Sequence, residues 1–213
     1  MFVTFEGIDG SGKTTIIKLL IDKIRQRGYD VISTREPGGD EIAEQIRNVV
    51  LDVNNKNMSP WAEALLYIAA RKQHLDSTII PALKNNKIVI CDRFMDSTTV
   101  YQGFARGLGM EEVDEIQRIV LNHATPDVTI FFDINPDQAR QRINERQKAE
   151  DRLDSENLAF HKKVYEGYQI LISQNSDRIK IVDARQEIND VIQKVEFIIL
   201  EAIESVLNNK NEK

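Results

Sequence analysis

The sequence has one cysteine, one tryptophan and no long apolar run in its 213 residues. The lone cysteine, Cys91, excludes a disulfide framework and a cysteine-based zinc cluster, and it suits a reducing compartment. No apolar stretch approaches the ~20 residues that a membrane-spanning helix needs. The first residues lack the basic flank and the long apolar stretch of a signal peptide. We therefore expect a cytoplasmic protein that has no membrane segment.

The chain also has fewer basic residues than acidic residues. The formal net charge is −6 and the isoelectric point is about 5.2, whereas domains that coat DNA or RNA are usually basic. This balance argues against a nucleic-acid polymer as partner. It does not argue against a nucleotide, because a few local arginines can bind one phosphate group. With 41% hydrophobic and 29% charged residues, the chain has the composition of one globular domain with a full core.

Apolar runs and helical periodicities alternate along the chain. The runs 88–91 and 128–132 are continuously apolar, which is typical of strands buried on both faces. Cys91 belongs to the first run, so we expect it to be buried and inert. The alternation predicts one three-layer α/β domain with a parallel sheet over residues 1–207, followed by a polar tail at 208–213. The expected strands are 2–6, 31–34, 88–91, 128–132 and 179–182. The expected helices are 13–28, 41–51, 59–84 with a break or bend at Pro81, 96–106, 111–123, 136–146, one that ends near 173, and 188–206.

Residues 7–14 fit the pattern G-x-x-x-x-G-K-[ST] between an expected strand and an expected helix. The glycines let the backbone fold tightly, so that its N–H groups converge on phosphate oxygens, and the positive end of the following helix points at the same anion. Lys13 would reach the β- and γ-phosphates, and the Thr14 hydroxyl would ligate Mg²⁺. The pattern therefore predicts a nucleoside triphosphate with Mg²⁺. The residues expected to bind it are Gly7, Ile8, Asp9, Gly10, Ser11, Gly12, Lys13, Thr14 and Thr15.

The remaining polar residues favour a kinase over a switch. The N-K-x-D segment that reads guanine in GTPases is lacking. Arginines gather instead at the expected strand ends and on nearby helices, and guanidinium groups bind phosphates through paired donors. Asp92 and Arg93 follow a buried strand, which is where ligands bind in open α/β sheets. The other basic residues of this set are Arg35, Arg47 and Arg71, and those near the polar, mobile loop expected at 147–155 are Arg142, Arg146, Lys148 and Arg152.

Five segments behind the phosphate-binding loop resemble, in order and spacing, those of the thymidylate kinases, and the resemblance runs along almost the whole chain. They are T-R-E-P-G-G at 34–39, Y-I-A-A-R at 67–71, D-R-F at 92–94, S-T-T-V-Y-Q-G at 97–103 and D-R-L-D at 151–154. The resemblance implies a P-loop nucleoside monophosphate kinase fold, with a five-stranded parallel sheet flanked by helices. It also implies transfer of the γ-phosphoryl group of ATP to dTMP with Mg²⁺, a step in dTTP synthesis, and a homodimer.

The resemblance further implies how dTMP would be bound. Tyr67 would stack on the thymine ring. The residues that would hold the phosphate group are Arg35, Arg47 and Arg93. The residues that would form hydrogen bonds to the base edge are Arg71, Ser97 and Gln102.

The sugar and the metal have their own implied residues. Tyr101 would crowd the 2′ position of the sugar and disfavour ribonucleotides, and Asp9 would accept a hydrogen bond from the 3′-hydroxyl. Asp92 would stand on the Mg²⁺ side of the site, acting through water. Glu36 would assist at the metal or at the sugar, and the sequence leaves both open.

Position 10 indicates which type of family member this chain resembles. In part of the family an arginine in the phosphate-binding loop touches the transferred phosphate, but here the position is Gly10. The basic residues lie in the expected lid at 143–153, as in the bacterial type. Closure of the lid would bring Arg152, with Arg146 or Lys148, onto the ATP phosphates and exclude water. The expected catalytic residues are Lys13, Arg93, Arg146 and Arg152. Ala43 and Phe94 replace a glycine and a tyrosine that are usual in the family, and neither position is one that must contact phosphate.

No general base is needed, because the acceptor is already a phosphate oxygen. His74, His123 and His161 are accordingly expected on helix surfaces or partly packed. The helices that carry Ile116, Ile119 and Val120, and Ala64, Leu65 and Ile68, could form a dimer interface or could face the sheet. One alternative is a kinase for another deoxynucleotide, such as dUMP or dCMP. A second alternative is an ATP-driven switch that regulates a partner protein.

Overall fold

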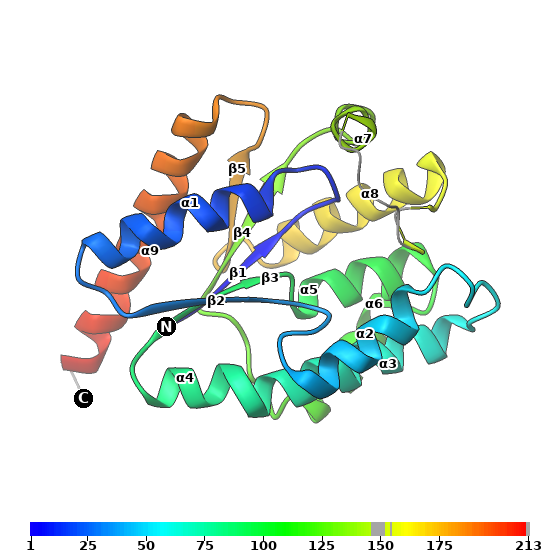
Figure 1. Cartoon of the computed structure of the whole chain (residues 1–213), viewed down its shortest axis with the longest axis horizontal. Helices are drawn as coiled ribbons and strands as arrows, with labels where there is room; N and C mark the ends of the chain where they lie inside the picture. The colour runs from blue at the N-terminus through cyan, green and yellow to red at the C-terminus, as the bar shows by residue number, and fades with distance from the viewer. Residues whose placement is uncertain (146–151, 154, 212–213) are drawn as a thin grey trace.

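The structure, a computed structural model, describes residues 1–145, 152–153 and 155–211. In this part of the chain, five strands form one parallel sheet in the order β2-β3-β1-β4-β5 (Figure 1). The expected fold class is therefore confirmed. The strands are β1 Phe2–Glu6, β2 Val31–Arg35, β3 Ile88–Asp92, β4 Val128–Asp133 and β5 Ile179–Asp183.

Helices cover both faces of the sheet. Helices α1 and α9 pack on the face that carries Val3 and Phe5, whereas α4, α5 and α8 lie on the opposite face (Figure 1). The helices with regular geometry are α1 Lys13–Gln26, α2 Glu41–Leu51, α3 Pro60–His74, α4 Ile80–Lys84, α5 Met95–Thr98, α6 Met110–Val120, α7 Pro136–Asn144, α8 Leu158–Gln174 and α9 Ile188–Asn211. Among the described residues, none of these helices is long and apolar enough to span a bilayer.

Two segments form wider π-type turns in place of the continuous helices that the sequence pattern predicted. One is η1 Leu75–Ile79, between α3 and α4, and the other is η2 Thr99–Ala105, after α5. Pro81 explains the first, because a proline has no N–H to donate and its ring crowds the carbonyl four residues earlier. The helix therefore widens before Pro81, where the sequence pattern placed a simple break or bend at that residue.

Boundary residues elsewhere agree with the local sequence. The side chain of Asp40 caps α2 by accepting from the backbone N–H groups of Ile42 and Ala43. Ser59 caps α3, with Pro60 in its first turn. The closing helix α9 extends to Asn211, into the segment that the sequence predicted as a polar tail. Cys91 is fully buried, as expected for a strand residue.

Candidate active site

Residues 7–14 connect β1 to α1 and form the phosphate-binding loop. Gly10 and Gly12 have φ angles of 82° and 92°, a region that favours glycine. A Cβ atom on Gly10 would lie 2.4 Å from the backbone oxygen of Ala139, so this position has no room for a side chain. The Lys13 ammonium donates to the backbone oxygens of Gly7 and Ile8 at 2.9 and 3.0 Å. Burial, together with the nearby Arg93, lowers the pKa of Lys13 to about 8.

Thr14 and Asp92 meet where α1 begins and β3 ends. The Thr14 hydroxyl donates to Asp92 Oδ2 at 2.7 Å. Both residues are therefore close enough to serve one ion, and oxygen donors are the ligands that Mg²⁺ prefers. This pair is the metal-side pair that the sequence predicted.

Arg93 links the end of β3 to the phosphate-binding loop. Its Nη2 donates to Asp9 Oδ1 at 2.7 Å, and its Nη1 donates to Ser97 Oγ at 3.0 Å. The Tyr101 hydroxyl donates to the other oxygen of Asp9 at 3.2 Å. Burial alone would raise the pKa of Asp9, but the positive charges of Arg93 and Lys13 hold it well below its usual range. Asp9 is therefore a carboxylate, and it holds Arg93 at the mouth of the loop.

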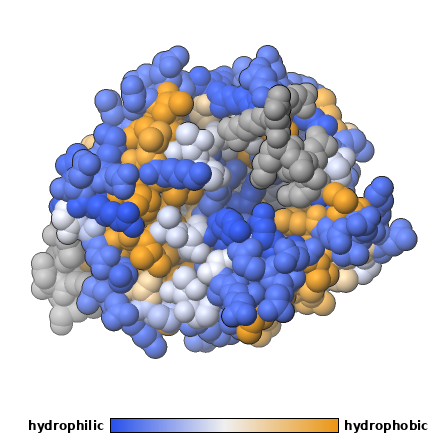
Figure 2. Space-filling view, in the orientation of Figure 1, coloured by the Kyte–Doolittle hydropathy of each residue, from blue (hydrophilic) through white to orange (hydrophobic). Residues whose placement is uncertain are grey.

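A cavity of about 330 Å³ opens beside the phosphate-binding loop. Figure 2 shows a hollow near the centre of this face, with hydrophilic residues around it. The cavity brings together residues that the sequence predicted from separate segments. Those that line it are Asp9, Gly10, Gly12, Lys13, Thr14, Arg35, Glu36, Arg47, Tyr67, Arg71, Asp92, Arg93, Ser97, Tyr101 and Gln102.

Two of the predicted phosphate ligands lie on the β2–α2 side of the cavity. Arg35 donates to Glu44 at 2.6 Å, and the side chain of Arg47 donates to the backbone oxygen of Pro37 at 2.7 Å. With Arg93, these residues give one cavity three guanidinium groups, which is an environment for a phosphate. Ala43, the departure that the sequence raised near Arg47, is fully buried in α2.

Arg71 is held by hydrogen bonds on three sides. Its Nε donates to Glu36 Oε2 at 2.6 Å. Its Nη1 donates to the side chains of Thr98 and Gln117, and its Nη2 donates to the backbone oxygen of Phe94. A guanidinium has five N–H groups. Within the described chain, these bonds leave one N–H on Nη2 for a ligand in the cavity that Arg71 lines.

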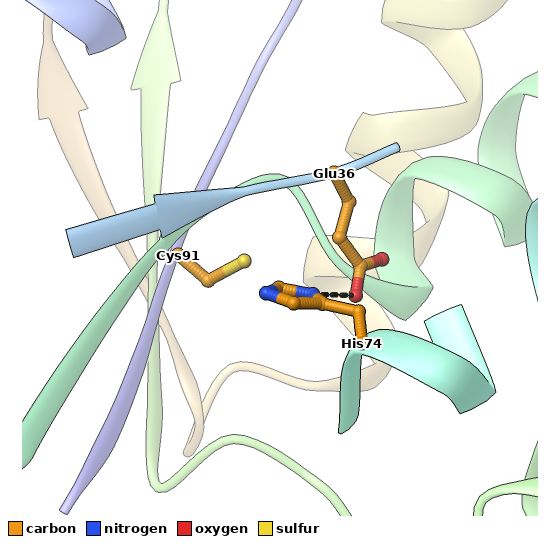
Figure 3. Close-up of side chains that lie close together, drawn as sticks. All are labelled: Glu36, His74 and Cys91. Atoms are coloured by element: carbon orange, nitrogen blue, oxygen red, sulfur yellow. Dashed lines mark hydrogen bonds and ion pairs between the residues drawn. The ribbon is translucent and has the colours of Figure 1, made fainter. Parts of the chain in front are cut away.

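Glu36, His74 and Cys91 form a buried cluster (Figure 3), of which Glu36 also lines the cavity. Glu36 Oε1 lies 3.0 Å from His74 Nδ1, and His74 Nε2 lies 2.7 Å from the Thr34 hydroxyl. Both ring nitrogens are therefore engaged, and burial raises the pKa of the Cys91 thiol well above its usual value. Because the guanidinium of Arg71 also contacts Glu36, the cluster disfavours a metal cation and instead holds the Glu36 carboxylate in place.

The prediction that the three histidines lie on helix surfaces or are partly packed is wrong for two of them. His74 is 0% exposed, and His161 is buried in α8. Both lie on helix faces that pack inward, and no pattern in the sequence separated them from surface histidines. His123, in contrast, is exposed after the end of α6.

Arg152 does not line the cavity. Its Nη1 lies 2.7 Å from Glu63 Oε2, and its Nε donates to the backbone oxygen of Val50 at 2.8 Å. The same Glu63 accepts a 2.8 Å hydrogen bond from the side-chain amide of Gln102. Arg146, Lys148 and most of the expected lid lie outside the described residues, so their expected contacts with ATP stay predictions.

Several residues that shape the site were missed by the sequence analysis. Glu6, at the end of β1, accepts hydrogen bonds from the Phe94 backbone N–H at 2.7 Å, the Ser97 hydroxyl at 2.6 Å and the Tyr168 hydroxyl at 2.8 Å. Burial, with Asp96 nearby, raises the pKa of Glu6 to about 7. The sequence feature that could have indicated Glu6 is its position as a charged residue at the end of an apolar strand, just before the loop. The other missed residues are Glu63, His74, Gln117 and Tyr168.

Two groups of residues suited to phosphate thus line one cavity, the glycine-rich loop with Lys13 and the three arginines. Together with the parallel sheet and its flanking helices, they define a P-loop kinase of the nucleoside monophosphate kinase fold.

Comparison with known proteins identifies the family within this class of kinases. A sequence profile described as thymidylate kinase matches residues 5–195. The thymidylate kinase of Mycoplasma capricolum is 50% identical over 204 residues, covering 95% of this chain and 96% of that protein. That of Oceanobacillus iheyensis is 47% identical over 211 residues, covering 99% and 92%. The crystal structure of thymidylate kinase from Ehrlichia chaffeensis superposes with a TM-score of 0.76 at 32% identity, covering 94% and 98%. The chain belongs to the thymidylate kinase family, phosphotransferases that convert dTMP to dTDP.

The raised pKa of Glu6 predicts a pH-dependent stability. Between pH 4.5 and about 7 the folded state keeps a proton on Glu6 that the unfolded chain releases, so the free energy of unfolding falls as the pH rises. In Glu6→Gln this contribution is lost. We expect the stability of the wild type relative to Glu6→Gln to fall by about 2 kcal/mol between pH 5 and pH 7.5, measured by urea unfolding. A constant difference between the two proteins would show that Glu6 does not titrate in this range.

Proposed function

We propose that the cavity binds dTMP while the phosphate-binding loop binds ATP, and that the γ-phosphoryl group passes directly from one nucleotide to the other. The observation that supports this acceptor is the pair of groups offered to a base. Within the described residues, Arg71 has one N–H left to donate, and an N–H of the Gln102 amide donates to Glu63, which turns the oxygen of that amide away from Glu63 as an acceptor. One donor and one acceptor therefore line the same cavity.

This pair matches the edge of thymine. The base presents a carbonyl at C4, which accepts, beside an N3–H, which donates. Cytosine reverses both, with an amino group at C4 and an acceptor at N3, so it would face Arg71 and Gln102 with two mismatches. Tyr67, which is largely buried and lines the cavity, offers an aromatic face to the ring.

The phosphate of dTMP would lie against Arg93, with Arg35 and Arg47 contributing from the other side. One of its oxygens attacks the γ-phosphorus of ATP, the bond from that phosphorus to the β–γ bridging oxygen breaks, and ADP leaves with the electron pair. The attacking oxygen carries no proton that must be removed. Catalysis therefore needs positioning and charge stabilisation, which Lys13 and Arg93 provide.

Thr14 and Asp92 would hold the magnesium ion that accompanies ATP. Their donor oxygens lie 2.7 Å apart beside the loop, Thr14 directly and Asp92 through water. When bound, the ion shields the negative charge of the phosphates. Lys13 and the loop backbone orient the same phosphates.

The sugar would lie between Asp9 and Tyr101, whose side chains are joined by a hydrogen bond. Asp9 would accept from the 3′-hydroxyl, and the Tyr101 ring would occupy the space that a 2′-hydroxyl needs. Glu36 is engaged by Arg71 and His74. It would act through Arg71 at the base edge, in addition to the sugar and metal roles that the sequence left open.

We also propose a homodimer that works in the cytoplasm, where the single cysteine is stable as a free thiol. Helices α2, α3 and α6 pack side by side and carry exposed apolar residues. Ile119 on α6 is 71% exposed, and Leu65 on α3 is 50% exposed. Exposed apolar groups that gather on neighbouring helices are typical of an interface.

An acceptor panel tests the proposed reaction. With Mg·ATP, we expect fast ADP release with dTMP, slower release with dUMP, and almost none with UMP, dCMP, AMP or GMP in a coupled assay. Some dUMP activity is expected because one methyl group is worth only about 1–3 kcal/mol in a pocket. Preference for dCMP would identify another nucleotide kinase. ATP binding without acceptor-dependent ADP release would favour the partner-regulated switch.

Arg152 gives a second test. In Arg152→Ala we expect kcat to fall about a hundredfold, with a much smaller rise in the KM for dTMP, because we propose that Arg152 leaves its contact with Glu63 when the nucleotides bind and then acts on the transferred charge. Arg185→Ala, at an exposed arginine paired with Asp183, serves as the control and should match the wild type. Steady-state kinetics decide this, and an unchanged kcat in Arg152→Ala would remove Arg152 from the catalytic set.

The proposed interface predicts that the wild type is a dimer and that a charge placed in the interface separates the two chains. The wild type should sediment at twice the chain mass of 24.4 kDa. Ile119→Glu should sediment as the single chain, because a charge cannot be buried in an apolar interface without a partner. Phe197→Glu on α9, at a residue that is 53% exposed, should remain dimeric. A wild type of single-chain mass, or a dimeric Ile119→Glu, would contradict this interface.

A further inference from the structure

Glu63 is a buried carboxylate behind the part of the cavity where the base would lie. It belongs to the first turn of α3 and is 1% exposed. Three side chains donate to it. Gln102 Nε2 donates to Oε1 at 2.8 Å, and Arg152 Nη1 lies 2.7 Å from Oε2. Arg106 donates more weakly to both oxygens, at 3.3 and 3.4 Å.

Stability alone is a weak reason for such an arrangement. Removing a carboxylate and guanidinium groups from water has a large desolvation penalty, and well-packed apolar residues often stabilise a fold as well as a buried ion pair does. What a carboxylate does, and an apolar group or an amide cannot do, is accept hydrogen bonds without ever donating one. That property acts directly on Gln102.

The side-chain amide of Gln102 has a donor end and an acceptor end of nearly the same shape. In the structure the donor end contacts Glu63, and within the described chain no group donates to its oxygen. Turning the amide over would place its oxygen at hydrogen-bonding distance from a carboxylate oxygen, where the two acceptors repel. Glu63 therefore allows one orientation of the amide and excludes the other.

We propose that Glu63 is a positioning residue for base selection, one that fixes the amide of Gln102 so that its oxygen faces the base. The proposal rests on the proposed function, since it concerns how the same cavity distinguishes thymine from cytosine. Thymine N3–H finds an acceptor, and cytosine N3 meets an oxygen that cannot turn into a donor.

Arg106, which donates to the Glu63 carboxylate, is itself fixed by two further contacts. Arg106 lies over the ring of Phe160, with 4.5 Å from its guanidinium carbon to the ring centre, and its Nη2 donates to Glu156 at 2.7 Å. These contacts limit rotation of the group that Glu63 accepts from. Arg106 does not line the cavity. It therefore offers a control that disturbs the same buried cluster and leaves the contact between Glu63 and Gln102 in place.

The experiment compares kcat/KM for dTMP and dCMP in four proteins: the wild type, Glu63→Gln, Arg106→Gln and the charge-conserving exchange Glu63→Gln with Gln102→Glu. In Glu63→Gln the residue at 63 can donate or accept, so Gln102 is free to turn. We expect the dTMP-to-dCMP ratio to fall about tenfold or more, since one of the two mismatches is relieved. Arg106→Gln should lose thermal stability and keep the ratio within about twofold of the wild type.

The exchange gives an answer even if Glu63→Gln does not fold. It keeps the net charge of the cluster and again places an acceptor-only group at the base, now at position 102, so the preference for dTMP should return. A preserved ratio in Glu63→Gln, an equal loss in Arg106→Gln, or an exchange that accepts dCMP as well as dTMP would overturn the proposal. A wild type that fails to prefer dTMP would instead overturn the proposed function.

Discussion

The ion pair between Arg93 and Asp9 is the contact on which the site depends. Strands β1 and β3 are parallel neighbours, so their carboxyl ends meet at one edge of the sheet. Arg93 follows β3 with a φ angle of 70°, and Asp9 lies in the loop that follows β1. Their attraction connects the residue after β3 to the loop after β1. The loop and the cavity therefore share a wall, which is the arrangement that the proposed transfer between two nucleotides needs.

Three buried carboxylates support this arrangement from below. Glu6 accepts from the segment that follows β3, Glu36 accepts from Arg71, and Glu63 accepts from Gln102. Each fixes the direction of a group that faces the cavity or adjoins it. A rigid polar site needs such an outer layer, because a donor on a flexible side chain is positioned only when its other contacts are satisfied.

Sequence patterns predicted the sheet and the loop because both have local signatures. The continuous apolar runs at 88–91 and 128–132 and the glycine spacing of residues 7–14 depend only on neighbouring residues. The contacts of Arg152 with Glu63 and of His74 with Glu36 join segments far apart in the chain. Charge and helical periodicity do not reveal which of many polar residues will face each other. The resemblance to a family named most of the cavity residues, but not the residues that hold them.

The π-type turn at Thr99–Ala105 has a consequence for how this stretch of chain can change. A wider turn rotates each residue by less than the ~100° of a regular α-helix, so the adjacent residues Tyr101 and Gln102 both line the cavity. Losing one residue from the segment would rotate the residues that follow it by roughly 100° about the helix axis. Substitutions in this segment thus act one position at a time, whereas a change of its length would move Tyr101 and Gln102 together relative to the cavity. The number of residues between β3 and α6 therefore helps to determine the shape of the cavity.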